Sequence, residues 1–173
     1  SGAQTGQEAD LYFSYTFNEM VSLTATDYFF PNDLAGNNAY FNYNMDWDKI
    51  NLGTEDQTGH VLELALSFNG TENLPLTVMF AMNVWGADSR SYTEQGGVMV
   101  PEDKIVMSKY VELGYAFSSG DMDVNIFAGA CLDNPDTDAG EPAGFYGQEK
   151  AGLIKLGVGF AKSLQLTNQF ELP

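Results

Sequence analysis

The sequence has little positive charge, one histidine and one cysteine. Its 7 lysines and arginines stand against 24 aspartates and glutamates, which gives a net charge of −17. So few cations argue against a nucleic-acid partner, because a phosphate backbone is bound by clustered lysines and arginines. A lone Cys131 cannot form an internal disulfide. Long apolar runs are also missing, and none approaches the roughly 18–20 residues that a membrane-spanning helix needs.

The length of 173 residues suits one domain with a sizeable core. We expect a single β-barrel domain over residues 1–173, incomplete at one or both ends. The segment from Ser1 to Ala9 is small and polar, so we expect any export signal to lie outside it.

Alternation of apolar and polar residues with a period of two recurs along the chain, whereas helical periodicity is nearly absent. In 61–68, every second residue is leucine or phenylalanine, and the residues between them are small or charged, apart from Val61. Segment 20–30 begins in the same way, but Asp27 interrupts its apolar face. The predicted strands are 9–17, 20–30, 60–69, 75–87, 107–117, 121–132 and 149–163, with an eighth that begins near 167.

The connections between these strands alternate in length. Tight turns are expected at 18–19, 69–75, 118–121 and 163–168, whereas the links at 31–59, 88–106 and 133–148 are long, acidic and rich in glycine. The strands are also longer than those of most globular sheets and match the ~9–11 tilted residues that cross a bilayer. Both features are typical of an up-and-down barrel with small turns on one side of a membrane and large loops on the other.

The composition of the second face distinguishes a membrane barrel from a soluble one. That face is mostly Gly, Ala, Ser, Thr and Asn, which suits a narrow barrel interior better than a water-exposed sheet. The sequence therefore predicts an all-β, up-and-down antiparallel transmembrane β-barrel of about eight strands, part of a larger barrel; a soluble β-sandwich or lipocalin-like barrel is the alternative. The residues expected to point outward are Leu62, Leu64, Leu66, Val78, Phe80, Leu113, Val124, Ile126, Leu156 and Val158.

Aromatic residues gather near the ends of the predicted strands, as in the girdles of membrane barrels. The expected girdle residues are Tyr28, Phe29, Phe30, Trp85, Phe145 and Tyr146 near the long loops, and Phe17, Phe117 and Phe170 near the tight turns.

Several phrases resemble uncharacterised outer-membrane β-barrel proteins of Bacteroidota. They are TDYFFP (26–31), YFNYN (40–44), HVLELALSFNG (60–70), YVELGYAF (110–117), FAGACLDNPD (127–136) and GLIKLGVGFAKSLQLTNQFELP (152–173). The resemblance implies a place in the bacterial outer membrane with extracellular long loops, and further strands before and after this segment. It carries no catalytic signature. Because the resemblance implies further strands, we expect an open wall between the first and last strands of this segment. The alternative is closure of residues 164–173 onto 9–17.

Four isolated charges fall on the predicted inward face: Glu63, Glu112, Asp123 and Lys155. A charge surrounded by protein must pair or meet water. Paired charges would fix a plugged barrel, which is the preferred interpretation, whereas unpaired charges would line a cation-preferring pore.

Catalytic and metal-binding candidates are few. His60, at the expected loop rim, would act as a general base only if Glu55, Asp56 or a facing carboxylate oriented it. Cys131 is interpreted as a small wall residue. Weak candidates for a hard cation such as calcium are Asp133, Asp136 and Asp138, with Glu141 close behind, and, with less support, Asp46 and Asp48 beside Trp47.

We therefore expect a structural or interaction barrel, or an accessory subunit of a surface complex, with no enzymatic activity and no cofactor. Its expected partners are outer-membrane lipid and other outer-membrane proteins. A small-solute channel is the first alternative, and a membrane-embedded hydrolase that uses His60 is the second.

Overall fold

The computed structural model describes residues 7–31, 39–45, 58–141, 143–167 and 170–172. In this part of the chain the fold is all-β, apart from one short 3-10 helix, η3 (Thr137–Ala139). None of its helices is long and apolar enough to cross a membrane. The strands are β1 (Ala9–Asn18), β2 (Val21–Phe29), β3 (His60–Phe68), β4 (Leu76–Gly86), β5 (Arg90–Gln95), β6 (Val98–Ile105), β7 (Lys109–Ser119), β8 (Met122–Cys131), β9 (Gly152–Ala161), β10 (Leu164–Thr167) and β11 (Phe170–Leu172).

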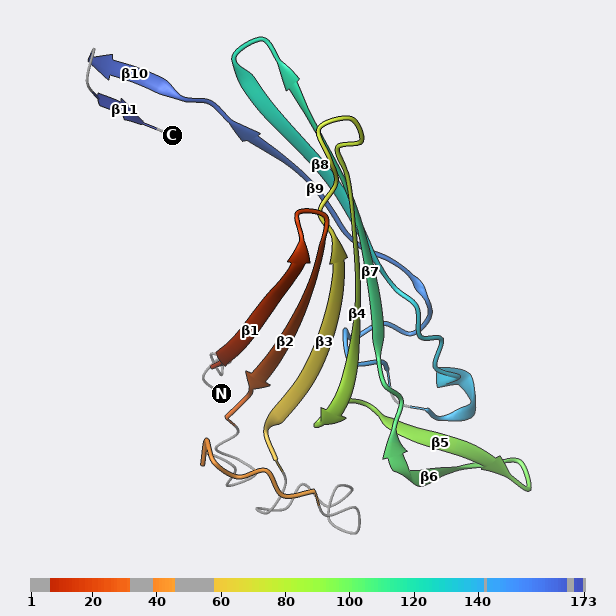
Figure 1. The fold of residues 1–173 in the computed structure, drawn as a ribbon. Helices are drawn as coiled ribbons and strands as arrows, with labels where there is room; N and C mark the ends of the chain where they lie inside the picture. The colour runs from red at the N-terminus through yellow and green to blue at the C-terminus, as the bar shows by residue number, and fades with distance from the viewer. Residues whose placement is uncertain (1–6, 32–38, 46–57, 142, 168–169, 173) are drawn as a thin grey trace, which may run out of the picture.

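Seven strands form one antiparallel sheet in the order β1-β2-β3-β4-β7-β8-β9. The sheet curves, with the tight turns at one end and the long connections at the other (Figure 1). All seven long strands predicted from the sequence are confirmed, with boundaries within three residues of the expected ones. The alternation of loop length is confirmed with them.

One face of this sheet is apolar and uncovered. Leu66 on β3 is 52 % exposed and Leu156 on β9 is 76 % exposed, and Phe13 and Tyr15 of β1 are similarly open. Nine of the ten residues predicted to point outward are exposed or half-buried. Val124 on β8 is the exception, at 7 % exposure. Its register partners are two large side chains, Phe117 on β7 and Phe160 on β9, which flank it on both sides.

The opposite face is polar, and its residues are mostly small. The register aligns Thr24 with Ala65 and Ala65 with Ala81, so small residues face one another across three strands. A small buried cluster forms here from Ala65, Ala81 and Tyr110, with Met79 and Tyr146 packed against it. Among the described residues, the hydrophobic cluster of Ala65, Ala81 and Tyr110 therefore lies on this inner face, whereas most of the leucine-rich face is open.

Two segments differ from the expectation. The link at 88–106 is not a plain loop, because it contains the hairpin β5–β6, which projects from the long-connection end of the sheet (Figure 1). Its turn is Gly96–Gly97, and both residues have positive φ (62° and 84°), which favours glycine in a tight hairpin turn.

The eighth strand expected to begin near 167 corresponds to β11, but it does not join the large sheet. β10 and β11 instead pair with each other in a separate two-stranded sheet, with Leu164 opposite Leu172. The seven-stranded sheet therefore ends at β1 and β9, and closure of 164–173 onto 9–17 is not observed. The expected open wall between the first and last strands is present (Figure 1).

Candidate functional site

The inner face of the curved sheet holds a cavity of about 580 Å³. Its lining comes from five strands of the large sheet, β2, β3, β4, β7 and β9, and from the connection between β8 and β9. The lining residues are Thr24, Thr26, Tyr28, Glu63, Ala65, Ser67, Met79, Tyr110, Glu112, Tyr146, Ile154 and Lys155. Strand parity explains this set apart from Ile154, because every second residue of a strand points to the same face. Ile154 adjoins Lys155 at a register shift between β8 and β9, where Leu153 pairs with Ala130 and Lys155 with Gly129.

Glu112 and Lys155 form an ion pair inside this cavity. Lys155 Nζ lies 2.8 Å from Glu112 Oε2, and the lysine reaches it from β9 across β8. Tyr110 donates a hydrogen bond from its hydroxyl to the same carboxylate at 2.7 Å. Lys155 Nζ also lies 4.9 Å from the ring centroid of Phe127 on the intervening strand. The pairing predicted for the inward charges is thus present for these two residues.

Glycines on the inner face make room for these side chains. A Cβ atom at Gly129 would lie 1.9 Å from the hydroxyl oxygen of Tyr110, and one at Gly157 would lie 2.2 Å from the ring of Phe127. The aromatic rings thus occupy the space that side chains at these glycines would fill. This packing explains why the second face predicted from the sequence is rich in glycine.

Glu63 lies in the same cavity but has a different partner. Its carboxylate accepts a hydrogen bond from the hydroxyl of Tyr28 at 3.1 Å. Among the described residues, no lysine or arginine pairs with it. Tyr28 therefore belongs to the inner face. The prediction that it lies in an outward aromatic girdle is wrong.

Asp123 is the predicted inward charge that lies apart. It occupies the inner face near the tight-turn end, where Ser118 Oγ donates to it at 2.7 Å. It lines a separate cavity of about 250 Å³ with Asn125 and Gly159. Three of the four predicted charges thus meet in one cavity, and the fourth does not join them.

Tyr146 enters the cavity from the long connection between β8 and β9. Its ring lies 5.7 Å from that of Tyr110, and the neighbouring Phe145 contacts Phe30 at the end of β2 with ring centroids 6.4 Å apart. This connection therefore reaches across the end of the cavity from β8–β9 to β2. Tyr146 is not an outward girdle residue, and periodicity could not have placed it, because it lies in an irregular segment.

The hydroxyl of Tyr146 is buried and has no hydrogen-bond partner in the described part of the chain. Burial, and then the negative charge of Glu63, raises the pKa of this phenol far above its usual value. The phenol is therefore protonated at neutral pH, and its donor and acceptor have no partner among the described residues.

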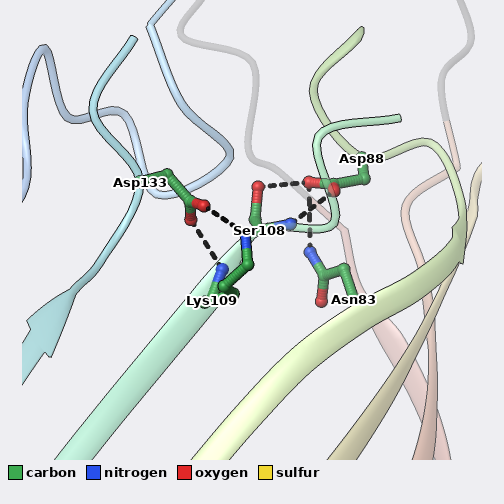
Figure 2. A network of polar contacts seen from close by, with 5 residues as sticks. All are labelled: Asn83, Asp88, Ser108, Lys109 and Asp133. Carbon is green, nitrogen blue, oxygen red and sulfur yellow. Dashed lines mark hydrogen bonds and ion pairs between the residues drawn. The ribbon is translucent and has the colours of Figure 1, made fainter. Parts of the chain in front are cut away.

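A polar network joins the end of β4 and the start of β7 to the connections beside them (Figure 2). Asp88 accepts hydrogen bonds from the backbone N–H of Ser108 at 2.8 Å, from Ser108 Oγ at 2.6 Å and from Asn83 Nδ2 at 3.2 Å. Asp133 accepts from the backbone N–H of Lys109 at 2.6 Å and from Lys109 Nζ at 2.9 Å. The carboxylates of Asp88 and Asp133 thus accept hydrogen bonds from two consecutive backbone N–H groups, those of Ser108 and Lys109, at the start of β7.

Two of the three predicted metal-ligand candidates after β8, Asp133 and Asp136, use their carboxylates in structural hydrogen bonds, and Asp138 lies within η3. Asp133 is turned toward Lys109, and Asp136, the N-cap of η3, accepts through Oδ1 from the backbone N–H of Ala139. Within the described residues, no group of three His, Cys, Asp or Glu side chains is arranged to hold a metal ion. The other predicted candidates, Asp46 and Asp48, lie outside the described residues.

His60 is fully buried on the outer face of the sheet, near the rim. Its ring is stacked between Phe29 and Tyr43, with centroids 4.6 Å and 4.1 Å apart. Nδ1 lies 2.8 Å from Asp27 Oδ1, and Nε2 contacts the backbone oxygen of Tyr40. The orienting carboxylate is thus Asp27, whereas Glu55 and Asp56 lie outside the described residues.

This packing leaves His60 no surface from which to act on a substrate. Both ring nitrogens are engaged by oxygen atoms, and the ring faces are covered. Cys131 is likewise buried, with its sulfur beside the backbone oxygens of Lys150 and Gly152. The geometry of both residues fits a structural role.

The comparisons with known proteins return no relative. No family model, no curated protein and no solved structure matches this chain.

Proposed function

We propose that this chain forms the wall of a bacterial outer-membrane β-barrel with a structural or interaction role, of the kind its sequence resembles. The observation that carries the proposal is the contrast between the two faces of the seven-stranded sheet. Leucine, valine, isoleucine and phenylalanine stand uncovered on the outer face, whereas charges and small polar residues gather on the inner face. A bilayer supplies the apolar surroundings that this outer face lacks.

Water is a poor solvent for such an outer face. Soluble monomers rarely expose a contiguous apolar patch larger than a few hundred Å². Here exposed or half-buried apolar residues run along seven adjacent strands, from Phe13 on β1 to Phe160 on β9. The strand lengths of 9 to 11 residues also match a tilted passage through hydrocarbon.

The sheet's two edges add a requirement to this proposal. Unpaired backbone N–H and C=O groups are costly in hydrocarbon. β1 and β9 must therefore each meet another strand in the membrane, whether of this polypeptide or of a neighbouring subunit. The acidic long connections would face the cell exterior and the tight turns the periplasm.

Fractionation and protease protection of the exported protein test the location. We expect the protein in the outer-membrane fraction, extracted only by detergent, with electrophoretic mobility that changes on boiling. Protease added to intact cells should cleave in the long connections and spare the tight turns. Recovery of folded protein from the soluble fraction would show that the outer face is covered in some other way.

A small-solute channel is the second candidate, and the cavity of about 580 Å³ favours it. The pairing of Lys155 with Glu112 and the inward position of Tyr146 favour a plugged interior instead. Conductance of the purified protein in planar bilayers separates the two. Stable unitary currents would support the channel, and their absence in protein shown to be folded would support the structural role.

A further inference from the structure

The cavity on the inner face contains a carboxylate without a cationic partner. Glu63 accepts one hydrogen bond, from the neutral Tyr28, whereas Glu112 a short distance away has both Tyr110 and Lys155. A partly buried carboxylate is stabilised by an opposite charge, and the described residues provide none at Glu63. A cation from outside the chain would complete this site.

Three tyrosines line the same cavity, namely Tyr28, Tyr110 and Tyr146. Aromatic rings attract cations through their negative faces, and the attraction grows where water is excluded. The hydroxyl of Tyr146 is buried and unpartnered, so it has a lone pair free to accept a hydrogen bond from an ammonium N–H. Apolar surface from Ala65, Met79 and Ile154 completes the lining.

The charge of the whole protein favours the same class of ligand. The net charge of −17 raises the local concentration of cations and repels anions. An inorganic ion would leave the apolar lining unused, and the described carboxylates do not form a metal site. The volume of about 580 Å³ lies in the range of small-molecule sites.

From these observations we infer that the inner-face cavity binds an organic cation. Its ammonium group would lie between Glu63 and Tyr146, and its apolar body would lie against the apolar lining described above. The site is built from the inner face alone. It therefore stands or fails separately from the membrane location, which concerns the outer face.

Isothermal titration of the folded protein in a non-ionic maltoside detergent tests the inference. The probes are benzylamine, which is a cation at neutral pH, its neutral analogue benzyl alcohol and the anion phenylacetate. We expect saturable binding of benzylamine, binding of benzyl alcohol that is about tenfold weaker or less, and no binding of phenylacetate. Equal binding of benzylamine and benzyl alcohol would overturn the inference, and so would a lack of saturable binding by benzylamine.

Two variants locate the site. Glu63→Gln should weaken benzylamine binding about tenfold while its side-chain oxygen still accepts from Tyr28. Asp123→Asn removes the same charge from the same face but in a separate cavity, so it should leave the affinity unchanged. Equal losses in both variants would mean general charge attraction and not a site.

A third variant covers the case in which Glu63→Gln does not fold. Tyr146→Leu removes the aromatic ring and the hydroxyl from a connection outside the sheet, and folding is checked by circular dichroism, which does not depend on the membrane location. We expect benzylamine affinity to fall severalfold in this variant. An unchanged affinity would overturn the proposed position of the ammonium group.

Discussion

Asp27 Oδ1 lies 2.8 Å from His60 Nδ1 on the outer face of the sheet, where the neighbouring residues are apolar. The two residues belong to adjacent strands, and Asp27 also accepts a hydrogen bond from the hydroxyl of Tyr43 at 2.9 Å. Partial burial, and then this hydrogen bond, raises the pKa of Tyr43 to about 12. The phenol therefore donates at all physiological pH values. Together these contacts hold residues 39–45 against the rim of the sheet.

Removal of the Asp27 carboxylate should loosen the attachment of residues 39–45 to the rim of the sheet. Asp27→Ala leaves Nδ1 of the buried His60 without its acceptor, and we expect a loss of about 1–3 kcal/mol in the free energy of unfolding. The measurement is urea unfolding of the protein folded in detergent, together with the rate of proteolysis within 39–45. Asp10→Ala, at an exposed carboxylate on β1, is the control and should stay within about 0.5 kcal/mol of the parent. Equal effects of the two substitutions would contradict a specific anchor.

The inner face provides a matched pair of glycines for a packing test. A Cβ atom at Gly157 would lie 2.2 Å from the Phe127 ring, whereas one at Gly159 would have its nearest neighbour, Asn125 O, at 3.9 Å. We expect Gly157→Ala to destabilise the protein by about 1–3 kcal/mol, since the ring must leave its place. Gly159→Ala should be neutral within about 0.5 kcal/mol.

A second substitution can test the contact between Gly157 and Phe127 directly. Adding Phe127→Leu to Gly157→Ala should recover part of the lost stability, because the smaller side chain leaves room for the new methyl group. Unfolding curves in urea measure all three variants under one condition. If Gly157→Ala and Gly159→Ala behave alike, the ring of Phe127 does not occupy the position described above.

The rim network allows a comparison of buried and exposed carboxylates. Asp88→Ala removes three hydrogen bonds and leaves the buried backbone N–H of Ser108 unpaired, so we expect a loss of about 1–3 kcal/mol. The control is Asp103→Ala, which breaks an exposed ion pair with Arg90 and should cost about 1 kcal/mol or less. Thermal unfolding, followed by circular dichroism, measures both. A larger effect at Asp103 would contradict the central role of Asp88.

Strand parity predicted the long strands and most of the inner face, because a period of two fixes which side each residue faces. Glu63, Glu112 and Lys155 follow from it directly. The hairpin β5–β6 was missed because its first strand, Arg90–Gln95, is mostly polar. The Gly96–Gly97 pair was the available signal for its turn.

Contacts between distant segments could not be predicted in this way. Asp27 breaks the apolar pattern of β2, and its reason becomes visible only when His60 and Tyr43 are placed beside it. Tyr146 enters the cavity from an irregular connection, where no periodicity indicates a direction. The distances of Asp123 from the other inward charges likewise depend on position along the strands, which parity does not give.

Leu64 on β3 tests the environment of the outer face. It is 40 % exposed in the middle of its strand, with Ala25 and Met82 as its register partners. Leu64→Arg should impair folding into lipid by about 2–4 kcal/mol if that face meets hydrocarbon near the bilayer midplane. Val98→Arg, at a more open apolar residue (63 % exposed) of the β5–β6 hairpin, is the control and should fold as well as the parent. Folding yields into lipid vesicles, measured by the mobility change on boiling, compare the two. An arginine tolerated at Leu64 as well as at Val98 would mean that water, and not lipid, covers this face.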